Sequence, residues 1–79
     1  MLRHIVERFE REASAFTKRD ITLSTDSFYS GEQRSYYKKL VIDGVETRHH
    51  IDIMDLQESM SRDRMNEKVR AIAGLILLG

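Results

Sequence analysis

The stretch that decides the fold lies between Tyr36 and Ile53 and reads YYKKLVIDGVETRHHIDI. Asp43-Gly44, between two runs rich in β-branched and aromatic residues, is the strongest short-range signal in the chain for a two-residue hairpin turn. The sequence therefore predicts two antiparallel strands, at residues 36–42 and 45–53, joined by a type I′ turn.

A further strand is predicted before this hairpin, at residues 20–29, where side chains alternate with period two. Gly31-Glu32 then suits a two-residue type II′ turn into the next strand. Turn length sets the register of a hairpin, so each predicted turn also predicts which residues face one another. The predicted partners are Leu23 with Leu40, Ile21 with Ile42, Leu40 with Thr47, and Tyr36 with Ile51.

These registers sort the strand side chains onto two faces of a three-stranded meander. The predicted apolar face holds Ile21, Leu23, Tyr29, Tyr36, Leu40, Ile42, Val45, Ile51 and Ile53. The other face is mainly polar and aromatic. Because turn chemistry alone produces this separation, two independent levels of the sequence agree on the meander.

Amphipathic helices flank the predicted sheet. Residues 2–16 place apolar side chains at helical spacing among charged ones. A last helix is expected to begin with Asp55 as its N-cap and Glu58 completing a capping box, and the polar segment near Ser61 is a potential break. Both helices should cover the apolar sheet face, since only that face needs burial.

The predicted fold class is therefore α+β. Its order is helix, three-stranded antiparallel meander with strand order 1-2-3, and helix, with both helices on one sheet face. Residues 1–79 are expected to form a single domain.

Composition narrows the function classes. The 79 residues include 13 basic and 13 acidic side chains, a balance unlike the footprint of a general nucleic-acid binder. The absence of Cys excludes disulfides, thiolate metal sites and Cys nucleophiles. No apolar run approaches the roughly 20 residues that a membrane span needs, so a cytoplasmic location and no membrane partner are expected.

No catalytic, cofactor-binding or metal-binding residues are predicted. His49 and His50 are adjacent on a strand and should point to opposite faces, which prevents them from sharing a site. No phosphate loop, nucleophile elbow or helical metal motif is present. The chain is therefore expected not to be an enzyme.

The uncovered sheet face supplies the first candidate binding surface. Its candidate residues are Phe28, Tyr37, Lys39, Arg48 and His50. Such a mixture of aromatic and basic groups suits a protein interface, where Tyr, Phe and Arg are enriched. It also suits base stacking by a single-strand binder, or an ordinary solvated sheet face with cross-strand pairs such as Tyr37 with His50.

Two further candidate surfaces lie near the C-terminus. Arg62, Arg64 and Lys68 are candidate phosphate contacts, although interleaved acidic residues equally indicate a salt-bridged, solvated helix face. Residues 71–78 are apolar nearly all round, and a helix of this kind needs cover on more than one side. Leu75, Ile76, Leu77 and Leu78 are the candidate interface, with a second copy of the chain as the expected partner. A groove on another protein and a frayed, exposed helix end are the alternatives.

The predicted order of elements resembles the double-stranded RNA-binding domain in topology and length. The contact motifs of that family are absent. Its Gly-Pro-x-His-like loop is replaced by Ser30-Gly31-Glu32-Gln33, and its Lys-Lys-x-Ala-Lys helix start is replaced by Asp55-Leu56-Gln57-Glu58. Acidic residues at that helix start would repel phosphate, so the resemblance implies a shared arrangement of elements rather than membership.

The sequence thus predicts a small non-enzymatic protein-interaction module. It would form homodimers through its apolar C-terminal helix and bind or cover a larger, unidentified protein. The alternative is a weak RNA- or DNA-binding domain that uses the exposed sheet face or the basic residues of the last helix.

Overall fold

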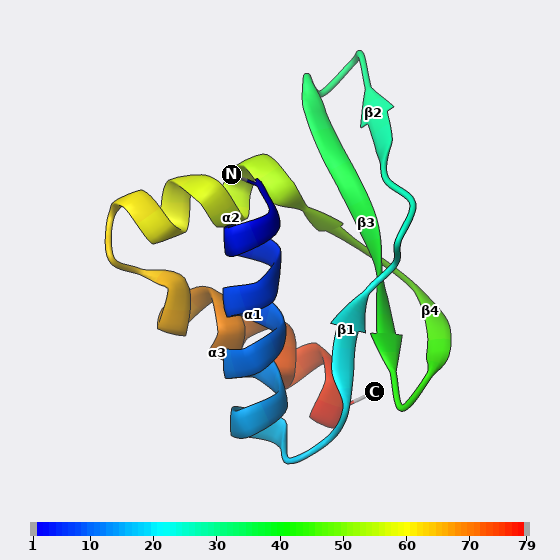
Figure 1. The fold of residues 1–79 in the computed structure, drawn as a ribbon, viewed down its shortest axis with the longest axis vertical. Helices are drawn as coiled ribbons and strands as arrows, with labels where there is room; N and C mark the ends of the chain where they lie inside the picture. Colours follow the sequence, from blue (N-terminus) through cyan, green and yellow to red (C-terminus); the bar gives the residue numbers. More distant parts are fainter. Residues whose placement is uncertain (1, 79) are drawn as a thin grey trace.

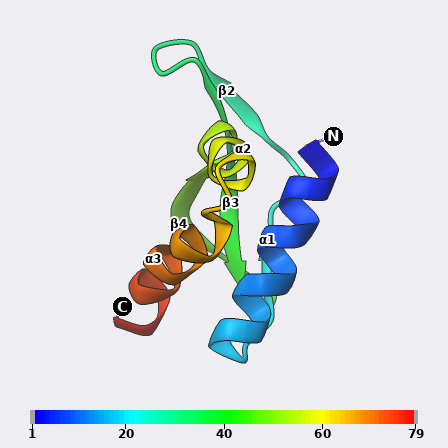
Figure 2. The same cartoon turned by 90° about the vertical axis from the view of Figure 1, so that its left-hand side faces the viewer.

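The computed structural model describes residues 2–78, with the side chains of Leu2 and Leu78 excepted. It confirms the α+β class, but it holds three helices and four strands within this range where two helices and three strands are predicted. Three helices lie on one side of an antiparallel sheet (Figures 1 and 2). The elements are α1 (Leu2–Thr17), β1 (Ile21–Leu23), β2 (Phe28–Ser30), β3 (Ser35–Ile42), β4 (Val45–Asp52), α2 (Ile53–Ser61) and α3 (Met65–Leu78).

Strand β3 is the centre of the sheet and pairs with each of the other three strands. Strands β1 and β2 occupy successive segments along one edge of β3, and β4 pairs with the other edge. The predicted meander is therefore correct in its order, but its first strand is interrupted at residues 24–27. Four residues separate Leu23 from Phe28, whereas two separate their partners Leu40 and Tyr37.

The interruption changes how the first hairpin closes. Leu23 lies opposite Leu40 as predicted. The connection to β3, however, is the longer turn 31–34, in which Arg34 and not Gly31 has a positive φ. The predicted two-residue turn at Gly31-Glu32 is therefore wrong. The turn is two residues longer than predicted. The interruption places two more residues between β1 and β2 than lie between their partners on β3. These two differences cancel, so the pairing of β1 with β3 keeps the predicted register.

The second hairpin confirms the predicted turn but not the whole register. Asp43 and Gly44 both have positive φ, as a type I′ turn requires. Between Lys39 and Val41 the pairing with β4 then shifts, so that Ile51 lies opposite Lys38 and not opposite the predicted Tyr36. The shift is by an even number of residues, and Ile51 consequently stays on the buried face.

The helices begin and end close to the predicted positions, with one correction. The N-cap of α2 is Asp52, whose side chain accepts a hydrogen bond from the backbone N–H of Asp55 at 3.1 Å. The predicted cap, Asp55, instead lies in the first turn of α2. The predicted break near Ser61 is present, because residues 62–64 separate α2 from α3.

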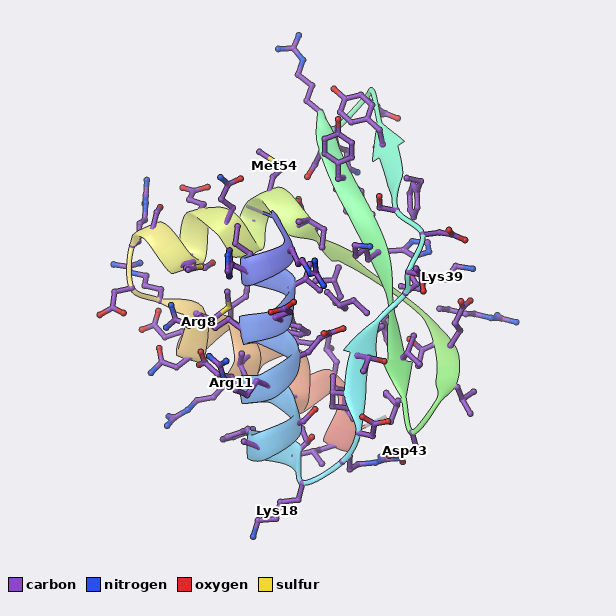
Figure 3. The ribbon with its side chains drawn as sticks, viewed as in Figure 1. Arg8, Arg11, Lys18, Lys39, Asp43 and Met54 are labelled. Carbon is purple, nitrogen blue, oxygen red and sulfur yellow. The ribbon has the colours of Figure 1, made fainter. Side chains whose placement is uncertain are left out.

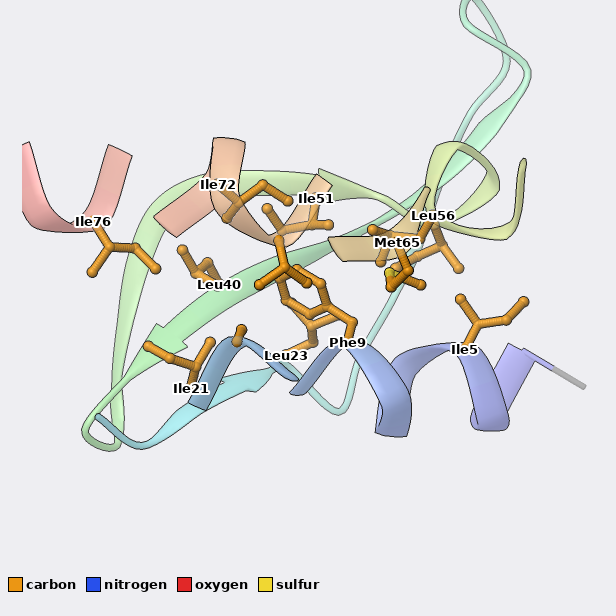
Figure 4. Close-up of a cluster of buried hydrophobic side chains, with 13 residues drawn as sticks. Ile5, Phe9, Ile21, Leu23, Leu40, Ile51, Leu56, Met65, Ile72 and Ile76 are labelled. Atoms are coloured by element: carbon orange, nitrogen blue, oxygen red, sulfur yellow. The ribbon is translucent and has the colours of Figure 1, made fainter. Parts of the chain in front are cut away.

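A single hydrophobic cluster joins the sheet to the helices (Figure 4). Phe9 from α1, Leu40 from β3 and Met65 from α3 are fully buried at its centre. Three residues predicted for the covered face are exposed, namely Tyr29, Tyr36 and Val45. They lie near the ends of the hairpins, and the β2 end of the sheet extends beyond α2 in both views (Figures 1 and 2).

Candidate functional site

Aromatic side chains gather on the sheet face that the helices leave uncovered. Phe28 stacks on Tyr37, with ring centroids 5.6 Å apart, and meets His50 edge-on at 5.1 Å. Three strands contribute to this cluster, which we call the Phe28 cluster (Phe28, Tyr37 and His50). The structure thus brings together three of the predicted binding-face residues. Tyr37 and His50 are not the direct cross-strand pair that the sequence predicts, because Lys39 lies opposite His50.

The two predicted cations of this face are arranged differently. Lys39 lies on the side of the sheet away from the helices (Figure 3) and forms an ion pair of 3.6 Å with Glu46. Arg48 is exposed within the irregular part of β4, between residues 46 and 50. The positive charge of the face is therefore diluted by a neighbouring carboxylate, which lowers its attraction for phosphate.

Acidic groups also influence the Phe28 cluster. Desolvation, followed by the negative charge of Asp52, raises the pKa of the Tyr37 phenol above its ordinary value. The same Asp52 accepts a hydrogen bond from the Ser35 hydroxyl and caps α2. The Tyr37 hydroxyl donates a hydrogen bond to the side-chain oxygen of Gln33.

The hollow beside the Phe28 cluster has a volume of about 170 Å³. Its lining residues are Phe28, Ser30, Gln33, Tyr37 and His50. Small-molecule sites usually enclose about 300–1,000 Å³. The hollow is therefore better matched to one side chain of a partner than to a whole substrate.

A second hollow, of about 250 Å³, lies between the start of α2, strand β4 and α3. One end is polar and includes the ion pair between Lys68 and Asp55, while the other end is apolar and reaches Leu75. Its lining residues are His50, Ile51, Asp52, Asp55, Leu56, Lys68, Ala71, Ile72 and Leu75.

The predicted C-terminal interface is divided by the structure. Leu75 and Leu77 are 55% and 60% exposed, as an interface residue of an isolated chain should be. Ile76 is only 8% exposed and belongs to the core, so its assignment to the interface is wrong. The reason is helical geometry, since Ile76 continues the buried stripe of Val69, Ile72 and Ala73. The side chain of Leu78 lies outside the described residues.

The predicted phosphate contacts are not one basic helix face. Arg62 and Arg64 lie in the connection between α2 and α3 and not on the last helix. Arg62 forms an ion pair with Glu58 at 3.1 Å, and Lys68 forms one with Asp55. Carboxylates of α2, and not the acidic residues interleaved with the cations, thus neutralise two of the three candidate phosphate contacts.

Sequence reasoning missed an exposed pair of tyrosines. Tyr29 and Tyr36 face each other across β2 and β3, with ring centroids 5.0 Å apart, and are 55% and 43% exposed. Met54 also projects outward, from the start of α2 (Figure 3). The only signal in the sequence that these two tyrosines are exposed is their type, because Tyr tolerates a solvent-exposed position where Ile or Leu would favour the core.

Clusters of metal-ligating side chains and membrane-spanning helices are both absent from residues 2–78. No group of three or more His, Asp or Glu side chains within this range is placed to hold a metal ion. None of its helices is long and apolar enough to cross a membrane.

Comparison with known protein families, with curated proteins and with solved structures finds no match for this chain. The topological resemblance to the double-stranded RNA-binding domain therefore receives no support from related sequences or structures.

Proposed function

We propose that this chain is a non-enzymatic protein-interaction module that self-associates through α3 and binds a larger protein partner. The observation that carries the proposal is the exposure of Leu75 and Leu77 on a helix whose apolar residues Met65, Val69, Ile72, Ala73 and Ile76 are buried. Leu75 and Leu77 are two positions apart, which is about 200° around the helix, so they cannot both belong to one narrow core-facing stripe. A second copy of the chain is the simplest source of cover for them, since a two-fold contact supplies each surface with its own complement.

A protein partner accounts for the charges better than nucleic acid does. The formal net charge is zero. Lys39 of the candidate binding face, and two of the three candidate phosphate contacts, Arg62 and Lys68, each form an ion pair with a carboxylate. Phosphate binding gains affinity from unpaired cations that displace counterions, and these ion pairs oppose that gain.

The surface offered to the larger partner is the hairpin of β2 and β3, which we call the aromatic hairpin (residues 28–37). It carries Phe28 stacked on Tyr37 on one face and Tyr29 beside Tyr36 on the other. Tyrosine and phenylalanine present large contact areas with few rotatable bonds, and aromatic residues are frequent hot spots of protein interfaces.

Self-association is tested by sedimentation velocity over a range of concentrations. We expect a concentration-dependent dimer for the native chain and loss of that dimer in the double variant Leu75→Glu/Leu77→Glu. The matched control is Val45→Glu/Met54→Glu, which introduces the same two charges at exposed residues on other elements. A native chain that remains monomeric at several hundred micromolar, or a dimer that both variants retain, would contradict the α3 contact.

The partner surface is tested by quantitative affinity capture with the native chain, Tyr29→Ser/Tyr36→Ser and the control Phe16→Ser. Phe16 is exposed on α1, away from the aromatic hairpin. We expect at least one protein retained by the native chain and the control but lost by the tyrosine variant, and direct binding of that purified protein in calorimetry. Equal recovery of every captured protein with all three chains would rule out the aromatic hairpin.

Nucleic-acid binding remains the second candidate, because Phe28 stacks on Tyr37 on the open face that also holds Lys39. Aromatic platforms beside a cation suit single-stranded bases. Fluorescence anisotropy with labelled single- and double-stranded RNA and DNA, across salt concentrations, tests this candidate. It predicts affinity that falls with salt and is reduced in Phe28→Ala; no binding at low salt would eliminate it.

A further inference from the structure

The connection between α2 and α3 is a complete helix-ending motif with an unfavourable residue in its critical position. The backbone N–H of Asp63 donates to the carbonyl of Met60 at 3.1 Å, and that of Arg64 donates to the carbonyl of Ser59 at 2.6 Å. This pair of bonds defines the Schellman motif, whose left-handed residue is usually Gly. Here that residue is Asp63, with φ of 56°.

Nothing in the local sequence compels the chain to break at this point. Residues 62–64 are Arg-Asp-Arg and contain neither Gly nor Pro. Straight-chain Arg is a good helix former and Asp a tolerable one, so a continuous helix over residues 53–78 is locally accessible. The break must therefore be enforced by packing.

The packing reason lies in the directions of the two apolar stripes. The buried residues of α2 are Ile53 and Leu56, with Met60 packed beside them. Those of α3 are Met65, Val69, Ile72, Ala73 and Ile76. At about 100° of rotation per residue, a straight helix would point these two stripes about 170° apart. One core could not receive both, but two cores on opposite sides of the helix could.

The second core is available only from another copy of the chain. Met65, Ile72 and Ile76 insert among side chains of α1, α2 and the sheet (Figure 4), so α3 cannot leave its site without uncovering that cluster. An identical copy offers an identical site, with every native contact reproduced between chains. Exchange of an element in this way is a low-cost route to a symmetric dimer.

We propose that two copies of this chain exchange α3, with residues 62–64 becoming helical in the exchanged dimer. This inference rests on the proposed self-association and names its mode, but it does not require the Leu75 and Leu77 contact. Helix α2 packs on its own core, and α3 packs on the core of the second copy. The ion pair between Lys68 and Asp55 is then formed between the two chains.

Substitutions at Asp63 shift the equilibrium in opposite directions. Asp63→Gly relieves the left-handed residue and weakens the continuous helix, so it favours the monomer. Asp63→Ala penalises the left-handed residue and strengthens the helix, so it favours exchange. After unfolding and refolding at several hundred micromolar, sedimentation velocity should give a dimer dissociation constant at least about 100-fold lower for Asp63→Ala than for Asp63→Gly, since both chains of the dimer contain the substitution.

Cross-linking decides whether a dimer is exchanged. Equal amounts of ¹⁴N- and ¹⁵N-labelled Asp63→Ala chains are refolded together and treated with a zero-length carbodiimide, which joins a paired ammonium and carboxylate. In the exchanged dimer, about half of the cross-links between Lys68 and Asp55 contain both isotopes. Lys39 and Glu46 lie on one hairpin and are 3.6 Å apart, so any cross-link between them stays within one chain and serves as the internal control.

The outcomes separate this inference from the α3 surface contact. A dimer whose Lys68–Asp55 cross-links are of single isotopes, and which Leu75→Glu/Leu77→Glu abolishes, is a surface dimer and overturns exchange. Mixed-isotope cross-links that persist in the leucine variant support exchange and contradict the surface contact. Equal association of Asp63→Ala and Asp63→Gly, or monomers only, also overturns exchange.

Discussion

The ammonium group of Lys38 donates hydrogen bonds to the backbone carbonyl of Ser24, at 2.9 Å, and to that of the next residue, Thr25, at the same distance. These carbonyls belong to the interruption between β1 and β2, where the ladder with β3 supplies no regular partner. Lys38 points to the helix-covered side of the sheet, yet its ammonium group supplies the hydrogen bonds that these two backbone carbonyls need. A cation on an otherwise apolar face is thereby explained.

Lys38→Met should destabilise the fold, because it keeps the apolar stem but removes both hydrogen bonds. We expect a loss of about 1–2 kcal/mol in the free energy of unfolding, measured by urea denaturation. The neighbouring Lys39→Met is the matched control and should cost less than about 0.5 kcal/mol, since Lys39 is exposed on the other face. Equal losses in the two variants would show that the Lys38 contacts are not stabilising.

Phe9 and Phe16 are separated by seven positions on α1, but only Phe9 is fully buried. Phe9→Ala should lower the free energy of unfolding by about 3–5 kcal/mol, through lost burial and a cavity, and leave much of this small domain unfolded. Phe16→Ala should cost no more than about 1 kcal/mol, because the exposed ring mainly meets the guanidinium of Arg70 at 5.8 Å. Thermal unfolding followed by circular dichroism measures both. A larger loss at Phe16 would contradict the placement of α1.

Asp43 should make stability depend on acid pH. Hydrogen bonds, first from Arg19 and then from the Asp20 backbone, lower the pKa of this carboxyl. A lowered folded pKa adds stability that is present above the unfolded value of about 3.9 and is lost as the pH falls through the folded value. Asp43→Asn keeps a residue that suits the type I′ turn but removes the charge.

The stability difference between the native chain and Asp43→Asn should therefore be constant near neutral pH and shrink below about pH 4. Urea denaturation at a series of pH values measures this difference. Asp26→Asn removes the same charge from an exposed loop position and provides the control. A difference that grows on acidification would contradict the ion pair with Arg19.

Tyr37 should titrate at higher pH than a free tyrosine. Desolvation and then the carboxylate of Asp52 raise its pKa. The difference between ultraviolet titrations of the native chain and Tyr37→Phe isolates this phenol. Its midpoint should lie above the ordinary value of about 10, and Asp52→Asn should bring it closer to that value while retaining a residue able to cap α2. A midpoint unchanged by Asp52→Asn would remove the carboxylate as a cause.

For this group the sign of the linked stability is opposite to that of Asp43. A raised folded pKa contributes stability that is fully present below the unfolded value and is lost as the pH rises through the folded value. Relative to its own stability at neutral pH, the native chain should therefore lose more stability on alkalinisation than Tyr37→Phe, which lacks this titrating phenol. Denaturation between pH 8 and 11 measures it.

The sequence predicted which residues lie on the candidate binding face better than it predicted which of them are neighbours. Phe28, Tyr37 and His50 gather on the uncovered face because their parity along the strands is preserved by irregularities of even length. The exact neighbours differ, since His50 lies opposite Lys39. The exposed pair of Tyr29 and Tyr36 could not be foreseen, because parity assigns a face but does not say how far the helices extend over it.

The sequence by itself determined the α+β class, the Asp43-Gly44 turn and the face to which most strand residues point. These features depend on local backbone chemistry and on the period of the apolar pattern, both of which act within a few residues. They hold even where the ladder slips, since a shift by an even number of residues leaves each side chain on its face.

Only the tertiary structure decided where the first strand is interrupted, which aspartate caps α2 and which of the C-terminal leucines stay exposed. Each of these depends on a partner distant in sequence: Lys38 for the carbonyls of Ser24 and Thr25, Ser35 for Asp52, and the core beneath α3 for Ile76. The sequence indicates a potential break near Ser61, but whether and where the helix breaks has the same tertiary origin, because opposed apolar stripes must both find a core while the local sequence permits a continuous helix.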